Sequence, residues 1–199
     1  SCPTSDGACA MVLTDEAGGT AAATGRYEDL HRFKVPQLRR VADLAASIGN
    51  AMGVPATRSR WLHRAALLHD VGKLGVSNMI LDKPGKLDER EWVAMRDHAA
   101  HTQAILGRIG ALADLAPIAA AHHERLDGTG YPLGLKDEQI RRETRIITVC
   151  DYYDALSSDR PYRAAMSVKE SLAIIAADIG TAVDGDCVEA LRAVVLRAD

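Results

Sequence analysis

The residues of this sequence with the clearest capacity for chemistry lie in the segment LLHDVGKLGVS, residues 67–77. His69 and Asp70 stand side by side there at the end of an apolar run, and Lys73 follows shortly after them. A neutral imidazole and an adjacent carboxylate can bind one divalent ion, or one ion each of a close pair. Two glycines in the segment let the backbone leave a helix and expose the pair. Because a His-Asp dipeptide alone is better explained as a structural helix end, its meaning depends on the rest of the chain.

Further side chains able to bind metal follow along the chain, each near an apolar helical run: His98, His122, His123 and Asp151. Together with His69 and Asp70 they exceed the needs of one ion, and they suit two ions that share a bridging carboxylate, which we assign to Asp70. Mixed nitrogen and oxygen ligands suit Fe, Mn, Zn or Co better than Mg or Ca. Two such ions can activate water, polarise a phosphoryl oxygen and stabilise a leaving oxygen. The pattern is therefore compatible with an in-line displacement at a metal-bound centre.

Helical periodicity connects these residues and must position them. Apolar residues recur at three and four from Leu38 to Met52, with Pro36 in the first turn, and again from Trp61 to Leu68, where Thr57 is the expected N-cap. A helix capped by Asp88 carries His98. The remaining expected elements are a short one at 76–81, helical runs at 102–109 and 112–123, and helices at 141–156, 168–179 and 183–196. Strict alternation is absent, so we expect an all-α bundle whose helices converge on the candidate ligands.

Composition limits the classes of function. Of 199 residues, 47% are apolar and 4% aromatic, and the net charge of −3 gives no field that would attract a nucleic acid polymer. The four cysteines show no CxxC spacing, which favours a reducing cytoplasm. No apolar stretch reaches the roughly 18 residues of a membrane span. Residues 1–25 are rich in Ala, Gly, Thr and Ser, and a short lead-in helix is expected at 26–34. We interpret residues 1–30 as a linker or the remnant of an upstream domain.

The ligand order and the segment HHERLDGTGYP, residues 122–132, resemble the HD-GYP family of bacterial cyclic di-GMP phosphodiesterases, within the HD superfamily of metal-dependent phosphohydrolases. The other matching segments are LLHDVGKLGV (67–76), LDKPGKL (81–87), DYYDALSSDRPYR (151–163) and GTAVDGDCVEAL (180–191). The resemblance covers about residues 36–197. It implies an all-α HD-domain helical bundle over residues 31–199 with an irregular GYP loop, here residues 124–136. It also implies a sensory or receiver domain upstream, and it leaves a homodimer open.

The resemblance assigns roles residue by residue. The implied metal ligands are His69, Asp70, His98, His122, His123 and Asp151, holding two divalent ions, with Fe or Mn preferred to Zn, Co or Ni. Lys73 resembles the catalytic lysine that contacts the scissile phosphate, acting with Asp70. The residues implied to contact or flank the substrate are Gly130, Tyr131, Pro132, Arg160, Arg163 and Asp154. Arg163 stands where the family often has lysine, and Asp154 resembles a carboxylate that faces substrate or supports a ligand.

One departure from the family pattern concerns the first helix. The family usually begins its ligand set with a histidine before an Arg-Val pair, and that position here is Gln37. Members with three ions also carry a glutamate one turn earlier, where this chain has Phe33, so we do not expect a third ion. A glutamine offers only a neutral carbonyl oxygen. His31 would have to bend back by six residues to replace the missing imidazole.

The leading interpretation is a metal-dependent phosphodiesterase that opens cyclic di-GMP to linear pGpG, with GMP as a further product left open. The second is a degenerate HD-GYP module that binds ligand or a protein partner without turnover, because Gln37 replaces the first histidine. The third is a hydrolase of another phosphorylated substrate, such as a different cyclic dinucleotide. Metal content and a nucleotide panel distinguish these interpretations.

Overall fold

The computed structural model of the chain describes residues 35–159 and 164–197. These residues form helices and loops without a strand, and a single isolated bridge joins Ile179 to Val183. The all-α fold class expected from the sequence is confirmed. The elements are α3 (Val35–Ala51), α4 (Ala56–Leu68), η2 (Val71–Gly75), α5 (Asn78–Leu81), α6 (Glu89–Gly107), η3 (Ala113–Leu115), α7 (Ala116–Ala119), η4 (Asp137–Gln139), α8 (Arg142–Ser157), α9 (Val168–Ala177) and α10 (Gly185–Val195).

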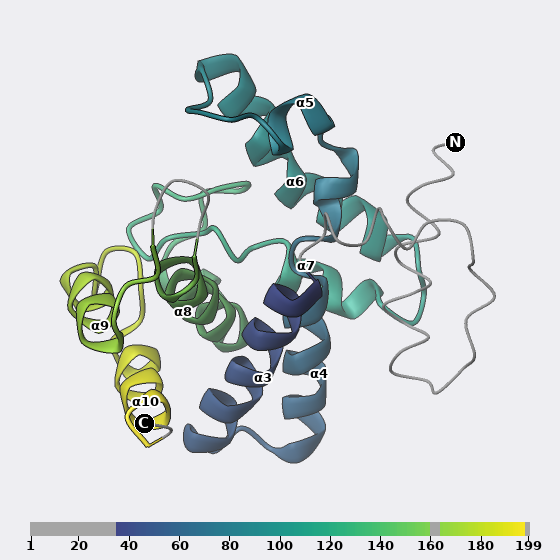
Figure 1. The fold of residues 1–199 in the computed structure, drawn as a ribbon. Coiled ribbons are helices and arrows are strands. Elements are labelled where there is room, and N and C mark those ends of the chain that lie inside the picture. The colour runs from purple at the N-terminus through teal and green to yellow at the C-terminus, as the bar shows by residue number, and fades with distance from the viewer. Residues whose placement is uncertain (1–34, 160–163, 198–199) are drawn as a thin grey trace.

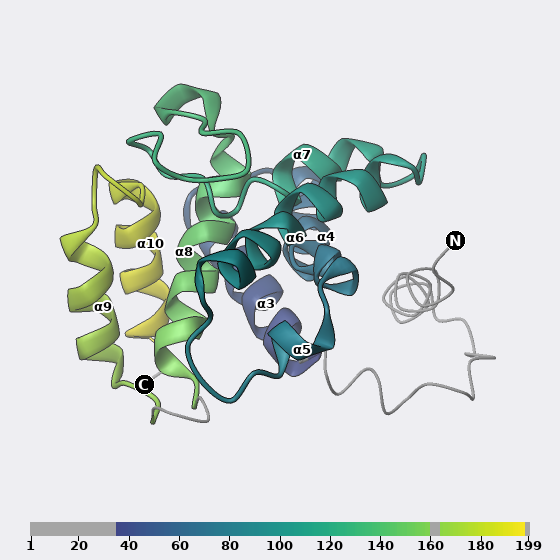
Figure 2. The same ribbon diagram turned by 90° about the horizontal axis from the view of Figure 1, so that it is seen from above.

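The helices pack around one apolar core. Helices α3 and α4 lie side by side, and α8 packs against α3 (Figure 1). Figures 1 and 2 show α9 and α10 beside α8 on one side of the molecule, with α6 and α7 on the other. Side chains from many helices are fully buried between them, including Ile48, Leu62, Leu106, Ile147 and Leu191. None of the helices in the described residues is both long and apolar enough to cross a membrane.

Gln37 lies at the end of α3 that is nearest to His69 and Asp70 along the antiparallel pair of α3 and α4. Asn50 Oδ1 lies 3.3 Å from Ser59 Oγ near the connection of the two helices, and Asp43 Oδ1 lies 3.1 Å from His63 Nε2 further along. The chain therefore moves back along α3 as it moves forward along α4. Gln37 is half-buried in the first turn of α3, and His69 and Asp70 follow the last turn of α4, so both lie at the end of the pair away from the connection.

Helix α6 begins as the sequence predicts. Asp88 accepts a hydrogen bond from the Glu91 backbone N–H at 2.9 Å, and the Glu91 carboxylate accepts one from the Asp88 N–H, which together form a capping box. The helix then continues to Gly107 and unites the two helical runs expected at 88–98 and 102–109. The predicted cap of α4 is wrong: α4 begins at Ala56 after Pro55, without a side-chain cap.

The helix expected at 112–123 is largely absent. The chain there forms only η3 and the four-residue helix α7, and His122 and His123 lie in the turn that follows. Side chains take the carbonyls that would continue the helix: Thr144 Oγ1 donates to Ile118 O at 3.0 Å, and His122 Nδ1 lies 2.7 Å from Ala119 O. The local amphipathic pattern cannot reveal this competition, because Thr144 comes from α8.

Several sequence predictions fall outside the described residues. They are the linker at 1–30 with its lead-in helix at 26–34, the departure at Phe33, the substitute ligand His31, and the cationic pair Arg160 and Arg163. They stay predictions.

Candidate metal centre

Six side chains from four parts of the fold converge on one place, which we name the His/Asp cluster: His69, Asp70, His98, His122, His123 and Asp151. The first two follow α4, His98 lies on α6, the histidine pair follows α7, and Asp151 lies on α8. The His122 and His123 ring centroids are 4.0 Å apart, and those of His98 and His123 are 5.0 Å apart. The structure therefore brings together every residue that the sequence assigned to metal binding.

Three histidines of the cluster are held in the same way. The Nδ1 atoms of His69, His98 and His122 lie 2.7, 2.6 and 2.7 Å from the backbone carbonyl three residues earlier. A carbonyl can only accept, so each Nδ1 carries the proton and donates it. In the neutral ring, Nε2 is then a bare acceptor facing the cluster. Metal-binding histidines are commonly oriented by this arrangement.

The inward-facing atoms lack partners. Among the described residues, Nε2 of His69, His98 and His122 and Oδ1 of Asp70 are buried and have no hydrogen-bond partner. Buried polar atoms without partners are rare, because leaving them unsatisfied costs about 1–3 kcal/mol each. Here four such atoms lie in the same buried cluster. A cation bound among them would satisfy all four, so the donor set fits a metal centre.

The cluster divides into two overlapping sets of three ligands. In one set, formed by His98, His122 and His123, all ligand atoms lie within 4.8 Å of one another; the same holds for His69, His122 and Asp151. Asp70 lies between the sets: its Oδ1 is 3.5 Å from His98 Nε2, and its Oδ2 is 3.4 Å from His69 Nε2. One carboxylate oxygen thus faces each set, as a bridging ligand requires.

The pKa values of His69 and Asp70 show that the cluster favours a positive charge near its two carboxylates. Burial lowers the pKa of His69, but Asp70 and Asp151 outweigh it and raise that pKa to about 10. Burial favours the neutral carboxyl of Asp70, yet Lys73 and His69 hold its pKa well below the usual range. In the absence of metal, a protonated His69 thus partly neutralises the negative charge of Asp70 and Asp151. A divalent ion bound there would displace that proton.

These shifts predict that the metal-free protein is most stable near neutral pH. Burial lowers the pKa of His98 and His122, and that of His123 to about 4, from the 6.5 of an exposed histidine. Between about pH 6.5 and pH 4 the unfolded chain therefore binds more protons, and stability falls with acid. The stabilising contribution of His69 is complete below pH 6.5 and is lost as pH rises toward 10.

Thermal unfolding of chelator-treated protein from pH 4.5 to pH 9 measures both effects. The carboxyls of Asp70 and Asp151 stay ionised over this range, because their pKa values are lowered. We expect the melting temperature to pass through a maximum between about pH 6.5 and 7.5. A melting temperature that keeps rising toward pH 4.5 would contradict the burial of neutral histidines.

The turn that carries His69 and Asp70 is fastened to α6 by Thr102. The buried Thr102 hydroxyl donates to His69 O at 3.0 Å and accepts from the Gly72 N–H at 2.9 Å. Gly72 lies so close to α6 that an added Cβ would stand 1.9 Å from His98 O. Only glycine fits there, and the close contact sets the positions of His69 and His98 relative to each other. Sequence reasoning passed over Thr102, because its partners lie some thirty residues away.

The other predicted site residues have distinct places. Lys73 Nζ lies 2.5 Å from Asp70 Oδ2, beside the cluster. Asp154 is buried, and its Oδ1 accepts a hydrogen bond from Arg40 Nε at 2.7 Å, which joins α8 to α3. This ion pair favours a supporting role for Asp154 over substrate contact. The Tyr131 ring stacks on His123 at 4.7 Å with 28° between the planes. Pro132 is exposed beyond it.

The GYP loop (residues 124–136) is anchored by Glu124, which sequence reasoning did not single out. Glu124 is 1% exposed, and its two carboxylate oxygens accept backbone N–H bonds from Leu133 at 2.6 Å and Leu135 at 2.9 Å. A Cβ on Gly130 would lie 2.5 Å from Glu124 Cα and His123 O, so the loop can close only with glycine there. Gly130 thus positions Tyr131 through its small size. The signal in the sequence was a carboxylate directly after the histidine pair.

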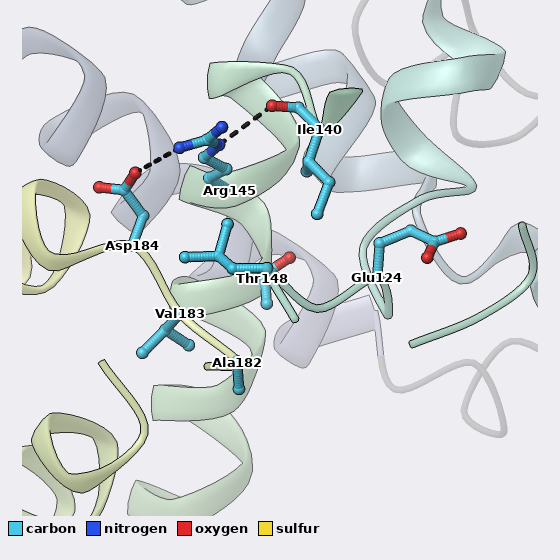
Figure 3. Close-up of a pocket in the computed structure, with 8 residues that line it drawn as sticks. Glu124, Ile140, Arg145, Thr148, Ala182, Val183 and Asp184 are labelled. Atoms are coloured by element: carbon cyan, nitrogen blue, oxygen red, sulfur yellow. Dashed lines mark hydrogen bonds and ion pairs between the residues drawn. The ribbon is translucent and has the colours of Figure 1, made fainter. Parts of the chain in front are cut away.

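A small cavity beside Glu124 is not a substrate site. Figure 3 shows Glu124, Thr148 and Val183 around it, with Arg145 bonded to Asp184 and to Ile140 O. Its volume of about 10 Å³ is at most enough for one water molecule. The cavity marks the packing of the GYP loop against α8 and the segment before α10.

Replacing Glu124 with alanine is expected to release the GYP loop. The change removes two hydrogen bonds to a charged acceptor and leaves the N–H groups of Leu133 and Leu135 without it, so the free energy of unfolding should fall by about 2–3 kcal/mol. Urea unfolding measures this loss, and limited proteolysis should show faster cleavage within residues 124–136. Glu138→Ala, at an exposed position near the same loop, is the matched control. Equal stability of the two variants would show that Glu124 does not hold the loop.

Comparisons with known proteins agree with this architecture. Residues 28–187 match the model of a family described as HD domain. A Vibrio cholerae protein named 3'3'-cGAMP-specific phosphodiesterase 3 is 53% identical over 153 residues, covering 77% of this chain and 33% of the relative. The cyclic di-GMP phosphodiesterase response regulator RpfG of Xanthomonas campestris pv. campestris is 39% identical over 161 residues, covering 77% and 41%.

A solved structure shares the fold. Bd1817, described as an HDG"Y"P protein from Bdellovibrio bacteriovorus, matches with a TM-score of 0.66 over 80% of this chain and 51% of its own, at 16% identity. At that identity the likeness speaks for the fold alone. The chain spans about a third of the Vibrio relative and about two fifths of the Xanthomonas relative.

Proposed function

Because this chain belongs to the HD-GYP family of HD-domain proteins, we propose that it is a metal-dependent phosphodiesterase that hydrolyses a cyclic dinucleotide. The observation that carries the proposal is the His/Asp cluster, where oriented imidazoles and a buried carboxylate oxygen face one another without partners. The relatives' names, which specify cyclic di-GMP and 3'3'-cGAMP, support the substrate class.

Two divalent ions, Fe or Mn before Zn, Co or Ni, are proposed to be held by the cluster. One would be held by His98, His122 and His123, and the other by His69 and Asp151, with Asp70 between them. When bound, such ions supply charge neutralisation at the phosphate and a nucleophile at neutral pH. The chain's own contribution is the rigid donor set, since each oriented histidine is locked by its backbone carbonyl.

Lys73 and Tyr131 are proposed to act on the substrate directly. The Lys73 side chain is 35% exposed and lies at the edge of the cluster beside Asp70, where its ammonium can meet the leaving oxygen. The Tyr131 ring, which stacks on His123, would contact a base or the ribose of the substrate. Gly130 and Pro132 shape the loop around it, and Arg160 and Arg163 remain proposed contacts to phosphate or guanine.

Cyclic di-GMP, opened to pGpG, is the proposed substrate, and 3'3'-cGAMP is the second candidate, because the Vibrio relative that is 53% identical is named for it. Purified protein loaded with Mn²⁺ or Fe²⁺ and incubated with both cyclic dinucleotides and with pGpG tests the proposal, with products separated by chromatography. We expect linear product from at least one cyclic dinucleotide. If a known phosphodiesterase cleaves the same panel while this protein binds the ligands unchanged, the hydrolase proposal is wrong.

The alternative is a module that binds a cyclic dinucleotide or a protein partner without turnover. Gln37 favours it, since this neutral side chain stands in the first turn of α3 where the family pattern has a histidine. An upstream sensory or receiver domain and a homodimer stay predictions.

A further inference from the structure

Arg96 is a cation at the edge of the site that neither the sequence motifs nor the proposed reaction uses. It lies on α6, two residues before His98, and its side chain is exposed. Its guanidinium carbon lies 5.5 Å from the centroid of the Tyr131 ring. No carboxylate in residues 35–159 and 164–197 forms an ion pair with it. A cation placed over an aromatic ring, rather than against an acid, keeps its charge available to an incoming anion.

The rings beneath Arg96 connect it to the cluster. The Tyr131 ring contacts both the guanidinium and His123, stacking on His123 at 4.7 Å between centroids, and His98 contacts Tyr131 edge-on at 6.3 Å between centroids. Arg96 is therefore two ring contacts away from the candidate metal ligands. The backbone of the GYP loop holds the Tyr131 ring beside His123, because the Tyr131 N–H donates to His123 O at 3.2 Å.

We propose that Arg96, supported by the Tyr131 ring, binds the second phosphate of a cyclic dinucleotide while the first lies at the His/Asp cluster. This inference rests on the proposed substrate class. A cyclic dinucleotide carries two phosphodiester anions within one small ring, so the uncleaved phosphate must lie about one nucleotide from the cluster. A guanidinium held over an aromatic ring keeps its N–H donors, and these can bind a phosphate with two parallel hydrogen bonds. The same contact would select cyclic dinucleotides over diesters with a single phosphate.

The test compares ligands that differ in the second phosphate. Cyclic di-GMP is set against linear GpG, which has two guanines and one phosphodiester, using metal-replete wild type, Arg96→Gln and Arg96→Lys. KM is measured where the protein turns a ligand over, and Kd by calorimetry where it does not. We expect Arg96→Gln to weaken cyclic di-GMP about tenfold or more, with kcat changed little and GpG affected less than about twofold. Arg96→Lys should fall between, since it keeps the charge without the planar, two-pronged donor group.

Arg90→Gln is the matched control, because Arg90 is an exposed arginine in the first turn of the same helix. Equal weakening of both ligands by Arg96→Gln, equal weakening by the control, or no weakening would each overturn the inference. Tight binding that depends on Arg96 without hydrolysis would overturn only the proposed reaction. Hydrolysis that is unaffected by Arg96→Gln would overturn only the present inference, and absence of both binding and hydrolysis would overturn both.

Discussion

Replacing Asp70 with asparagine is expected to abolish metal binding at the His/Asp cluster and to reduce turnover by at least about a hundredfold. The two oxygens of Asp70 face both sets of candidate ligands, at 3.4 Å from His69 Nε2 and 3.5 Å from His98 Nε2. An amide of the same shape keeps one neutral oxygen and presents an N–H₂ group to an acceptor nitrogen or to Lys73. Metal content per chain, measured by elemental analysis, and initial rates on the cyclic dinucleotide test this expectation.

The control for Asp70→Asn is Asp97→Asn. Asp97 is an exposed carboxylate next to His98, so its replacement changes the net charge near the site by the same amount without touching the cluster. We expect this variant to bind metal and turn substrate over like the wild type. If Asp70→Asn retains two ions per chain, Asp70 is not the bridge, and the two ligand sets must be served separately.

The ligand set was accessible from the sequence because each member stands beside an apolar run. Buried helices turn their inner faces toward one another, so polar residues at the ends of such runs have few places to lie other than a shared interior site. His69, His98 and Asp151 follow this logic directly. The resemblance to the HD-GYP family supplied the roles, and the matched HD-domain model confirms the family.

The parts that sequence reasoning missed depend on contacts between distant segments. Thr102 fastens the turn at His69, and Thr144 takes the carbonyl of Ile118, yet both look like ordinary residues within their own helices. Glu124 reaches the backbone of Leu133 across its own loop. Local periodicity cannot reveal a side chain that forms a hydrogen bond with the backbone of a distant segment. For the same reason the helix expected at 112–123 was too long.

Neighbouring residues of the GYP motif have different structural roles. Gly130 belongs to the motif because no side chain fits against the backbone of His123 and Glu124, whereas Tyr131 belongs to it through its ring. Arg96, outside the motif, lies over that ring. A residue can therefore serve the site through its small size or through its ring, and a residue outside the motif can contact that ring.

Replacing Gln37 with histidine is expected to tighten metal binding about tenfold or more, a size typical of gaining or losing a supporting interaction at a metal site. Residue 37 lies in the first turn of α3, at the end of the antiparallel α3 and α4 pair where His69 and Asp70 follow α4, and we expect an imidazole there to add a nitrogen donor to the set that contains His69 and Asp151. We expect turnover to rise at limiting Mn²⁺ and to match the wild type at saturating Mn²⁺, because the change affects occupancy of the site rather than its chemistry. Metal titration followed by calorimetry, with rates measured at each metal concentration, distinguishes the two regimes.

Gln103→His provides the control for this gain, because it introduces the same imidazole at an exposed position on α6. A parallel rise in metal affinity in both variants would indicate nonspecific binding by the added histidine. Turnover that appears only in Gln37→His, and at no Mn²⁺ concentration in the wild type, would mean that the natural domain binds its ligand without cleaving it. In that case Gln37 itself, by withholding one nitrogen donor from an otherwise complete cluster, would be the residue that converts a hydrolase into a receptor.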